Sequence, residues 1–218
     1  MISIILIATF AGLAYYHTVL HGDEFSDISK RVSNRLGRLW DIAHQGMREN
    51  RLLRAEKALL TILKIDERNA AAYNRLGILY AKQKEYKDAI DCFEIASSIE
   101  ATPSSLHNLG LIYYETENYE KASVAFEQAL KLENNLAARH VAYAKVAEKL
   151  QNDKLMFQEL EKAIELEPNE ETYTLLLSAY RTRGMGIEAD QIIENMKQLK
   201  LGSPTQRKRM LRPKKVVI

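Results

Sequence analysis

Residues 73–96 read YNRLGILYAKQKEYKDAIDCFEIA, and residues 106–129 read LHNLGLIYYETENYEKASVAFEQA. Both stretches begin with a large apolar residue, followed by Leu and Gly at offsets 3 and 4, Tyr at 7, Ala at 16, Phe at 20 and Ala at 23. Weaker copies of the pattern recur about every 34 residues from Leu36 to Ser203. A fixed period of this length predicts stacked helical hairpins in place of one globular core.

Each copy of the pattern divides into two helices, each with one apolar stripe. Tyr73, Leu76 and Tyr80 lie three and four residues apart, so they share one face of the first helix. Phe93 belongs to the matching stripe of the second helix. Gly77 lies within the first stripe and costs roughly 1 kcal/mol of helix propensity. We therefore expect another helix to approach closely at this glycine.

Short polar segments separate the expected helices. Residues 83–86 and 116–119 predict the turns inside two hairpins, since helical hairpins need only a few connecting residues. Asn69 and Pro103 fall between successive hairpins. Proline suits the first position of a helix because the N–H that it lacks has no partner there.

These residues resemble the tetratricopeptide repeat, whose pattern is a large residue, Leu-Gly, a Tyr, and later an Ala, a Phe, an Ala and a Pro. The resemblance implies an all-α fold, a solenoid of about five helix-turn-helix repeats. The five copies fall at residues 36–69, 70–102, 103–136, 137–169 and 170–203. The first and last copies are degenerate, as expected of terminal repeats that expose one face to water.

The composition favours a binding protein over an enzyme. The net charge of +2 provides no overall field for nucleic acid. The single cysteine, Cys92, cannot form an internal disulfide, and we interpret it as an apolar filler beside Phe93. The sequence shows no nucleophile–base arrangement, no phosphate-binding loop and no metal-ligand set. We therefore expect no catalytic residue, no cofactor and no metal.

Residues 1–21 favour a membrane anchor in the form of a single transmembrane helix. No Asp, Glu, Lys or Arg occurs from Ile2 to Leu20, and these 19 residues would span roughly 28 Å as a helix, against about 30 Å of hydrocarbon. A cleaved signal peptide and a buried helix are the alternatives. A signal peptide would have a basic start and small residues before the cut, and residues 18–22 match this poorly.

The expected orientation follows from the basic residues after the anchor, which are Lys30, Arg31, Arg35 and Arg38. Under the positive-inside rule, they place the repeats in the cytoplasm of a single-pass membrane protein, and the layout suggests a bacterial inner membrane. Residues 22–35 continue the helical spacing and predict an amphipathic neck helix. We expect its apolar stripe to pack on the first repeat, with dimerisation or contact with the membrane surface as alternatives.

The resemblance also implies a concave groove, because in this family the first helices of successive repeats line one surface. The matching candidates here are Trp40, His44, Asn74, Ile78, Lys82, His107, Leu111, Tyr114, Lys145 and Arg181. Apolar residues near the centre and charges at the edges suit a partner's peptide or amphipathic helix. Tyr114 is the expected exposed aromatic anchor, and Trp40 could instead pack on the neck helix. His140 occupies nearly the same repeat position as His107, and we interpret it as a lining residue too.

Residues 204–218 form a basic tail beyond the last repeat, which Ser203-Pro204 ends. The basic residues are Arg207, Lys208, Arg209, Arg212, Lys214 and Lys215. One interpretation is a disordered, solvated tail. The other is contact with anionic lipid, to which each basic residue near the surface would contribute about 1 kcal/mol. RNA binding is less expected because no aromatic residues are interleaved.

Together these features predict a membrane-anchored scaffold or adaptor that binds a protein or peptide partner in its groove. One alternative is a self-assembling structural protein that forms a homo-oligomer through the neck or the anchor. The other is a lipid- or RNA-tethering protein that acts through the tail.

Overall fold

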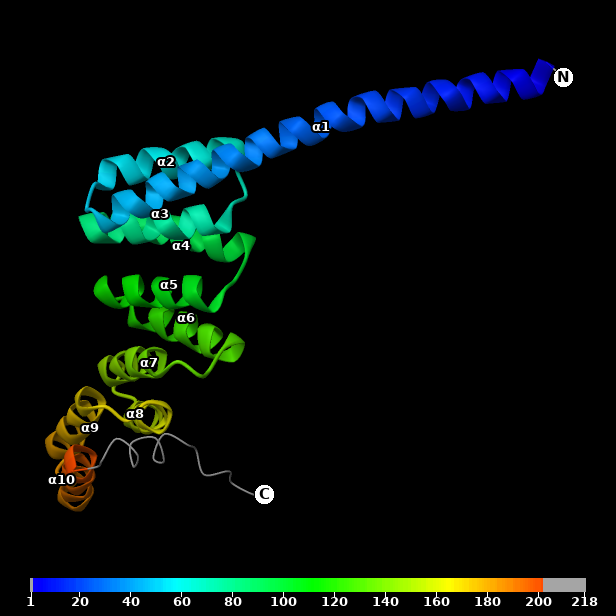
Figure 1. Cartoon of the computed structure of the whole chain (residues 1–218). Coiled ribbons are helices and arrows are strands. Elements are labelled where there is room, and N and C mark those ends of the chain that lie inside the picture. The colour runs from blue at the N-terminus through cyan, green and yellow to red at the C-terminus, as the bar shows by residue number, and fades with distance from the viewer. Residues whose placement is uncertain (1, 202–218) are drawn as a thin grey trace. The chain divides into compact units, whose positions relative to one another are not determined.

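The computed structural model describes residues 2–201, so the predicted tail lies outside the described residues. The described chain folds into ten helices and contains no strand. In chain order they are α1 (Ile2–Arg48), α2 (Leu52–Ile65), α3 (Ala70–Gln83), α4 (Tyr86–Ile99), α5 (Pro103–Glu115), α6 (Tyr119–Leu132), α7 (Ala137–Lys149), α8 (Asp153–Leu166), α9 (Glu170–Thr182) and α10 (Gly186–Leu201) (Figure 1). The predicted all-α solenoid fold is confirmed.

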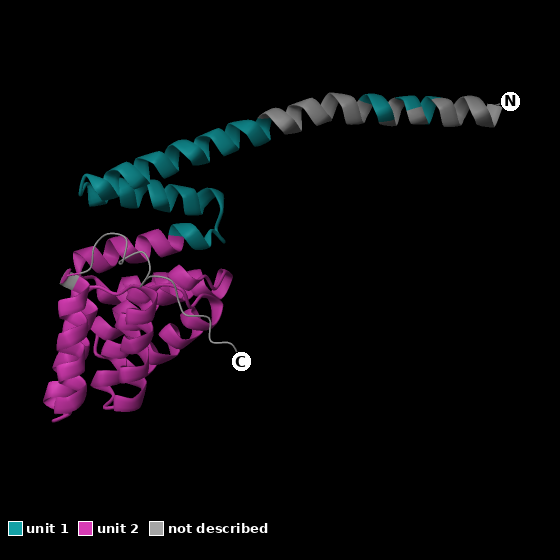
Figure 2. Cartoon of the chain, turned by 60° about the horizontal axis from the view of Figure 1, so that its bottom comes forward, with its two compact units in different colours: residues 1–72 teal, residues 73–218 magenta. Residues whose placement is uncertain are grey.

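The chain divides into two compact units, residues 1–72 and residues 73–218 (Figure 2). In the first unit, α1 and α2 form one hairpin. Its contact surface is built from small and branched side chains, because Ala43, Ala55, Leu59 and Ile62 are all fully buried. The second unit contains the other hairpins, and successive hairpins pack through α4 on α5, α6 on α7 and α8 on α9.

The expected anchor, neck and first repeat helix are continuous segments of α1, a single helix of 47 residues. Of the helices in the described part of the chain, none combines the length and the apolar character needed to cross a membrane. In the neck, Ile28 is 60% exposed and Val32 is 41% exposed. The prediction that this stripe packs on the first repeat is therefore wrong for these two residues. Among the residues whose burial is described, the stripe is partly covered from Leu36, in the part of α1 that pairs with α2.

In two hairpins of the second unit, an aromatic ring packs directly against the backbone of a glycine on the neighbouring helix. A Cβ atom added to Gly77 would lie 2.6 Å from the ring of Phe93, and one added to Gly110 would lie 2.9 Å from the ring of Phe126. Both rings are at most 2% exposed. The close approach expected from the Leu-Gly pairs is confirmed, and its cause is the phenylalanine of the second helix.

The turn inside each hairpin contains one residue in the left-handed region of backbone space. The five residues are Asn50, Lys84, Glu117, Gln151 and Gly184, with φ between 56° and 68°. The residue after each one donates its N–H to a carbonyl five positions earlier, as from Glu85 to Tyr80 at 3.0 Å and from Asn118 to Tyr113 at 2.8 Å. This hydrogen bond ends the first helix and reverses the chain. The predicted turns at residues 83–86 and 116–119 are confirmed.

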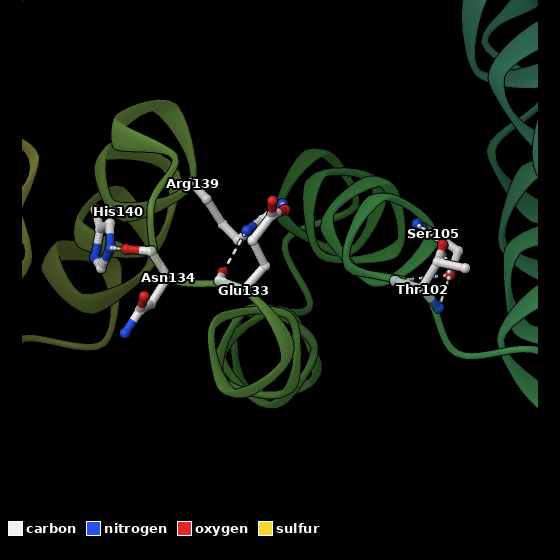
Figure 3. Close-up of polar contacts among 6 residues, drawn as sticks. All are labelled: Thr102, Ser105, Glu133, Asn134, Arg139 and His140. Carbon is white, nitrogen blue, oxygen red and sulfur yellow. Dashed lines mark hydrogen bonds and ion pairs between the residues drawn. The ribbon is translucent and has the colours of Figure 1, made fainter. Parts of the chain in front are cut away.

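Side-chain caps begin three of the helices that follow a linker between hairpins. Asn69 accepts from the N–H of Ala72 at 2.9 Å, and Asn169 accepts from the N–H of Thr172 at 2.9 Å. Thr102 and Ser105 cap α5 reciprocally, with Pro103 at the first helical position as expected (Figure 3). Such caps satisfy N–H groups that have no partner within the helix.

Candidate functional site

The predicted groove residues of the second unit lie on the first helices of its hairpins. We call Asn74, Ile78, Lys82, Leu111, Lys145 and Arg181 the first-helix row. They lie on α3, α5, α7 and α9. Asn108 on α5 donates a hydrogen bond to Asn74 on α3 at 3.1 Å, and α5 also contacts α7. The row therefore runs across neighbouring helices.

The first-helix row has an apolar middle and basic residues around it. Leu111 is 40% exposed, and Ile78 at the equivalent repeat position is half-buried. Lys82, Lys145 and Arg181 are exposed. The row therefore exposes both apolar surface and positive charge.

Two predicted lining residues of the second unit are less open than expected. The ring of His107 packs edge-on against Phe126, with ring centres 5.5 Å apart, and its Nδ1 atom is buried without a hydrogen-bond partner. Burial, together with the positive charge of Arg139, lowers the pKa of His107. Tyr114 is half-buried and packs edge-on against Tyr119 at 5.6 Å. Neither ring is a freely exposed anchor.

Trp40 and His44 belong to the first unit. Trp40 is half-buried, His44 is exposed, and their ring centres are 5.6 Å apart along α1. Both residues therefore remain surface candidates within their own unit.

The prediction that His140 lines the groove is wrong. The residue is 5% exposed, and its Nδ1 atom lies 2.6 Å from a carboxylate oxygen of Glu159 on α8, which is 7% exposed. Its Nε2 atom lies 3.0 Å from the carbonyl oxygen of Asn134 (Figure 3). A histidine held between two acceptors inside a hairpin serves the fold, and a ligand cannot reach it.

Arg139 lies in the first turn of α7, a helix that begins without a side-chain cap. The guanidinium is 2% exposed and donates to the carbonyl oxygen and to the carboxylate of Glu133, the latter at 3.1 Å (Figure 3). The buried side chains of Arg139 and His140 thus stabilise the linker from α6 to α7 through hydrogen bonds to it. The sequence feature that could have revealed this role is the size of the residue. The positions equivalent to Arg139 in the other repeats hold the small residues Ala72, Ser105 and Thr172.

Two hollows among the described residues of the second unit are lined by no predicted groove residue. The α6 hollow has a volume of about 410 Å³ and is lined by Glu94, Ser97, Leu106, Leu109, Tyr113, Glu120, Lys121, Val124, Ala125 and Gln128. The α10 hollow has a volume of about 350 Å³ and is lined by Glu161, Ile164, Glu165, Tyr173, Leu176, Tyr180, Glu188, Gln191, Ile192 and Asn195.

The two hollows occupy equivalent places in the repeat. Each contains a tyrosine whose hydroxyl donates to a glutamate 19 residues earlier, Tyr113 to Glu94 and Tyr180 to Glu161. Burial, with a contribution from the hydrogen bond to Glu161, raises the pKa of Tyr180 to about 12. Both tyrosines are therefore neutral hydrogen-bond donors at physiological pH.

Cys92 is a buried free thiol. Burial, with smaller contributions from Asp88 and Asp91, raises its pKa to about 11. Because the thiolate is the reactive form, this residue is a structural filler, as the sequence suggested. Among the described residues, no group of three or more His, Cys, Asp or Glu side chains is placed to hold a metal ion.

Residues 68–135 match the family model of the tetratricopeptide repeat. This segment carries the tetratricopeptide pattern. The matched segment contains α3 to α6, where the turns, glycines and phenylalanines follow the pattern most closely. No curated protein sequence matches the chain.

Several solved protein structures share this fold. The crystal structure of MamA is 19% identical, with 77% of this chain and 96% of that chain covered and a TM-score of 0.68. MamA from Desulfovibrio magneticus RS-1, from residue 41 to the end, is 13% identical, with 78% and 97% covered and a TM-score of 0.69. YrrB, described as a tetratricopeptide repeat protein with an unusual peptide-binding site, is 19% identical, with 70% and 79% covered and a TM-score of 0.62. At these identities the likeness establishes the fold.

Proposed function

We propose that this protein is a scaffold that binds a segment of a partner protein along its first-helix row. The fold is suited to protein–protein interaction, and the YrrB structure provides an example with a peptide-binding site. The row presents side chains from consecutive hairpins, so a ligand that lies across it would contact several repeats at once. Binding of this kind needs no catalytic group.

The observation that carries the proposal is Leu111, an apolar side chain left 40% exposed in the middle of the row. Ile78 lies at the equivalent place on the preceding first helix, and Lys145 follows on α7. A fitting partner is an amphipathic segment with apolar residues towards Ile78 and Leu111 and an acidic residue towards Lys145. Apolar contact would supply affinity, while the charges would set orientation.

Photo-crosslinking in cells tests this proposal, with a photoreactive amino acid in place of Leu111. The matched control is Leu132, another exposed leucine, which lies at the end of α6 and outside the row. We expect a discrete heavier band from position 111 only, and a weaker band when Lys145→Glu is added. Equal capture from both positions would contradict a specific site on the row.

We propose further that residues 1–21 tether the scaffold to a membrane with the repeats in the cytoplasm. This proposal rests on the sequence, in which an uncharged segment precedes Lys30 and Arg31. The test compares the full chain with a fragment that starts at Ser33, using alkaline carbonate extraction. The full chain should stay in the membrane pellet while the fragment is released. Extraction of both would refute the tether.

Self-assembly and tethering by the tail remain alternative proposals. Exposed Ile28 and Val32 would favour self-association through α1. Mass measurements of the full chain at two concentrations separate a homo-oligomer from a monomeric scaffold.

A further inference from the structure

The α10 hollow differs from the α6 hollow mainly in charge. Nine of the ten lining residues of the α6 hollow have a counterpart 67 positions later in the α10 hollow, so Tyr113 pairs with Tyr180 and Glu94 with Glu161. The exceptions are Glu120 in the α6 hollow and Glu165 in the α10 hollow. At one pair the charge reverses, because Lys121 corresponds to Glu188. Lys121 lies over the Tyr113 ring, 5.2 Å from its centre, and places a cation within the α6 hollow. Glu188 places a carboxylate at the matching point of the α10 hollow.

The α10 hollow is consequently acidic above an apolar floor. Its described lining includes Glu161, Glu165 and Glu188 and contains no lysine or arginine. Leu176 and Ile192 are at most 9% exposed and belong to the buried cluster beneath. A ligand of matching chemistry has basic residues on either side of apolar ones.

The chain's own C-terminal segment has this chemistry. Residues 202–218 include six basic residues and no acidic residue, and Met210-Leu211 stand between Arg209 and Arg212. The segment follows directly after α10, the helix that supplies one wall of the hollow. Its local concentration at the hollow is therefore high, as for any tethered ligand.

The distances permit the contact. Glu188 lies 13 residues before Leu201, which is about 20 Å along the helix. The six residues 202–207 span at most about 20 Å when extended. Because the reversal itself uses several of these residues, it is the residues from Arg209 onward that can reach back to Glu188. Gly202 and Pro204 are residues that favour such a reversal.

We propose that residues 204–218 dock in the α10 hollow of the same molecule, with Met210-Leu211 over the apolar floor and the flanking arginines facing Glu161, Glu165 and Glu188. The docked segment would occupy this end of the solenoid until a competing ligand displaces it. This proposal concerns a surface separate from the first-helix row, so it does not depend on the proposed function.

Trypsin protection of the full chain tests the contact through one charge reversal. Glu188→Lys installs the residue type that the α6 hollow already contains, so the fold should tolerate it, and circular dichroism checks this. The control is Asp190→Lys, which makes the same charge change at an exposed position of α10 outside the hollow. We expect cleavage after Arg207 and Arg209 to be about three- to tenfold faster in Glu188→Lys, and unchanged in the control. Equal rates in all three proteins would overturn the proposal.

A photoreactive amino acid at Met210 of the full chain provides the second test. Crosslinks within one molecule to the peptides that contain Tyr173 or Ile192 are expected, and Glu188→Lys should reduce their yield. Adding Arg209→Glu to Glu188→Lys should restore part of that yield. Crosslinks only between molecules would overturn intramolecular docking. Protection of the tail from trypsin only when phosphatidylserine vesicles are present would also overturn intramolecular docking. That result would show that the tail binds anionic lipid.

Discussion

Gly77 and Gly110 are the residues at which a single methyl group decides how closely two helices meet. Each has an aromatic ring where a Cβ atom would stand. The low helix propensity of glycine is offset because the aromatic ring of the second helix is buried in the space that a side chain would fill. The repeat therefore depends on a residue pair, Gly77 with Phe93 or Gly110 with Phe126, more than on either member.

We predict that Gly77→Ala destabilises the second unit. Displacing the Phe93 ring should cost about 1–3 kcal/mol, and improved helix propensity should return only roughly 1 kcal/mol. Gly37→Ala is the control, because a Cβ atom at Gly37 has nothing within 4 Å. Urea denaturation should show a lower free energy of unfolding for Gly77→Ala and no loss for Gly37→Ala. Equal stability of the two variants would contradict the packing account.

The hairpin turns provide a second prediction at single residues. Gly184 has φ of 68° with no atom near its Cβ position, so Gly184→Ala should lose about 1–2 kcal/mol through backbone strain alone. Lys84, with φ of 63°, is already strained. Lys84→Gly should therefore be neutral or up to about 1 kcal/mol more stable, because added freedom in the unfolded chain offsets part of the relief. Thermal denaturation measures both changes, and a shift of both variants in the same unfavourable direction would refute the argument.

At the scale of elements, the buried pair of His140 on α7 and Glu159 on α8 stabilises the hairpin that these two helices form. Burial lowers the pKa of His140, but the hydrogen bonds to the Glu159 carboxylate and the Asn134 carbonyl outweigh this effect and raise the pKa overall. The folded state therefore binds the proton more tightly than the unfolded state. The resulting stabilisation is fully present below the ordinary histidine pKa of about 6.5 and is lost as pH rises through the folded-state value.

The pair makes stability depend on pH. The free energy of unfolding of the native chain, minus that of His140→Gln, should fall as pH is raised above about 6.5. Taking this difference cancels the contribution of His107, whose pKa is shifted in the opposite direction. Glu159→Gln should remove most of the pH dependence that His140 provides. A difference that is flat with pH, or that grows with pH, would show that the pair does not hold the proton.

At the scale of the whole molecule, the described helices contact mainly their neighbours in sequence. Stability in such a chain is a sum of hairpin and neighbour terms, so damage should stay local. Cys92 reports on this property because its thiol is buried on α4 and, with a pKa of about 11, reacts mainly when α4 opens.

We predict that Gly77→Ala, in the hairpin of Cys92, speeds thiol labelling about tenfold for each 1.4 kcal/mol that it costs. Gly184→Ala lies in the last hairpin and should leave the rate nearly unchanged. Labelling with a thiol reagent under native conditions measures both rates. Equal acceleration by both variants would show that the second unit opens as one cooperative block.

Much of the fold follows from local spacing along the chain. The period of about 34 residues, the stripe of Tyr73, Leu76 and Tyr80, and the turn at residues 83–86 predict hairpins, because helix periodicity decides which side chains share a face. The same reasoning predicts the first-helix row, because equivalent repeat positions fall on equivalent faces of their helices. It also anticipated that a helix lies against Gly77.

Other features depend on residues brought together from separate helices. His140 looked like a lining residue by its repeat position, yet Glu159, 19 residues away on α8, makes it a buried partner. The acidity of the α10 hollow likewise arises where Glu161, Glu165 and Glu188 from two helices meet above one floor. Repeat position decides which face a side chain occupies, but burial and charge at a point depend on what the neighbouring helix places opposite it. Only the packing of the helices settles that.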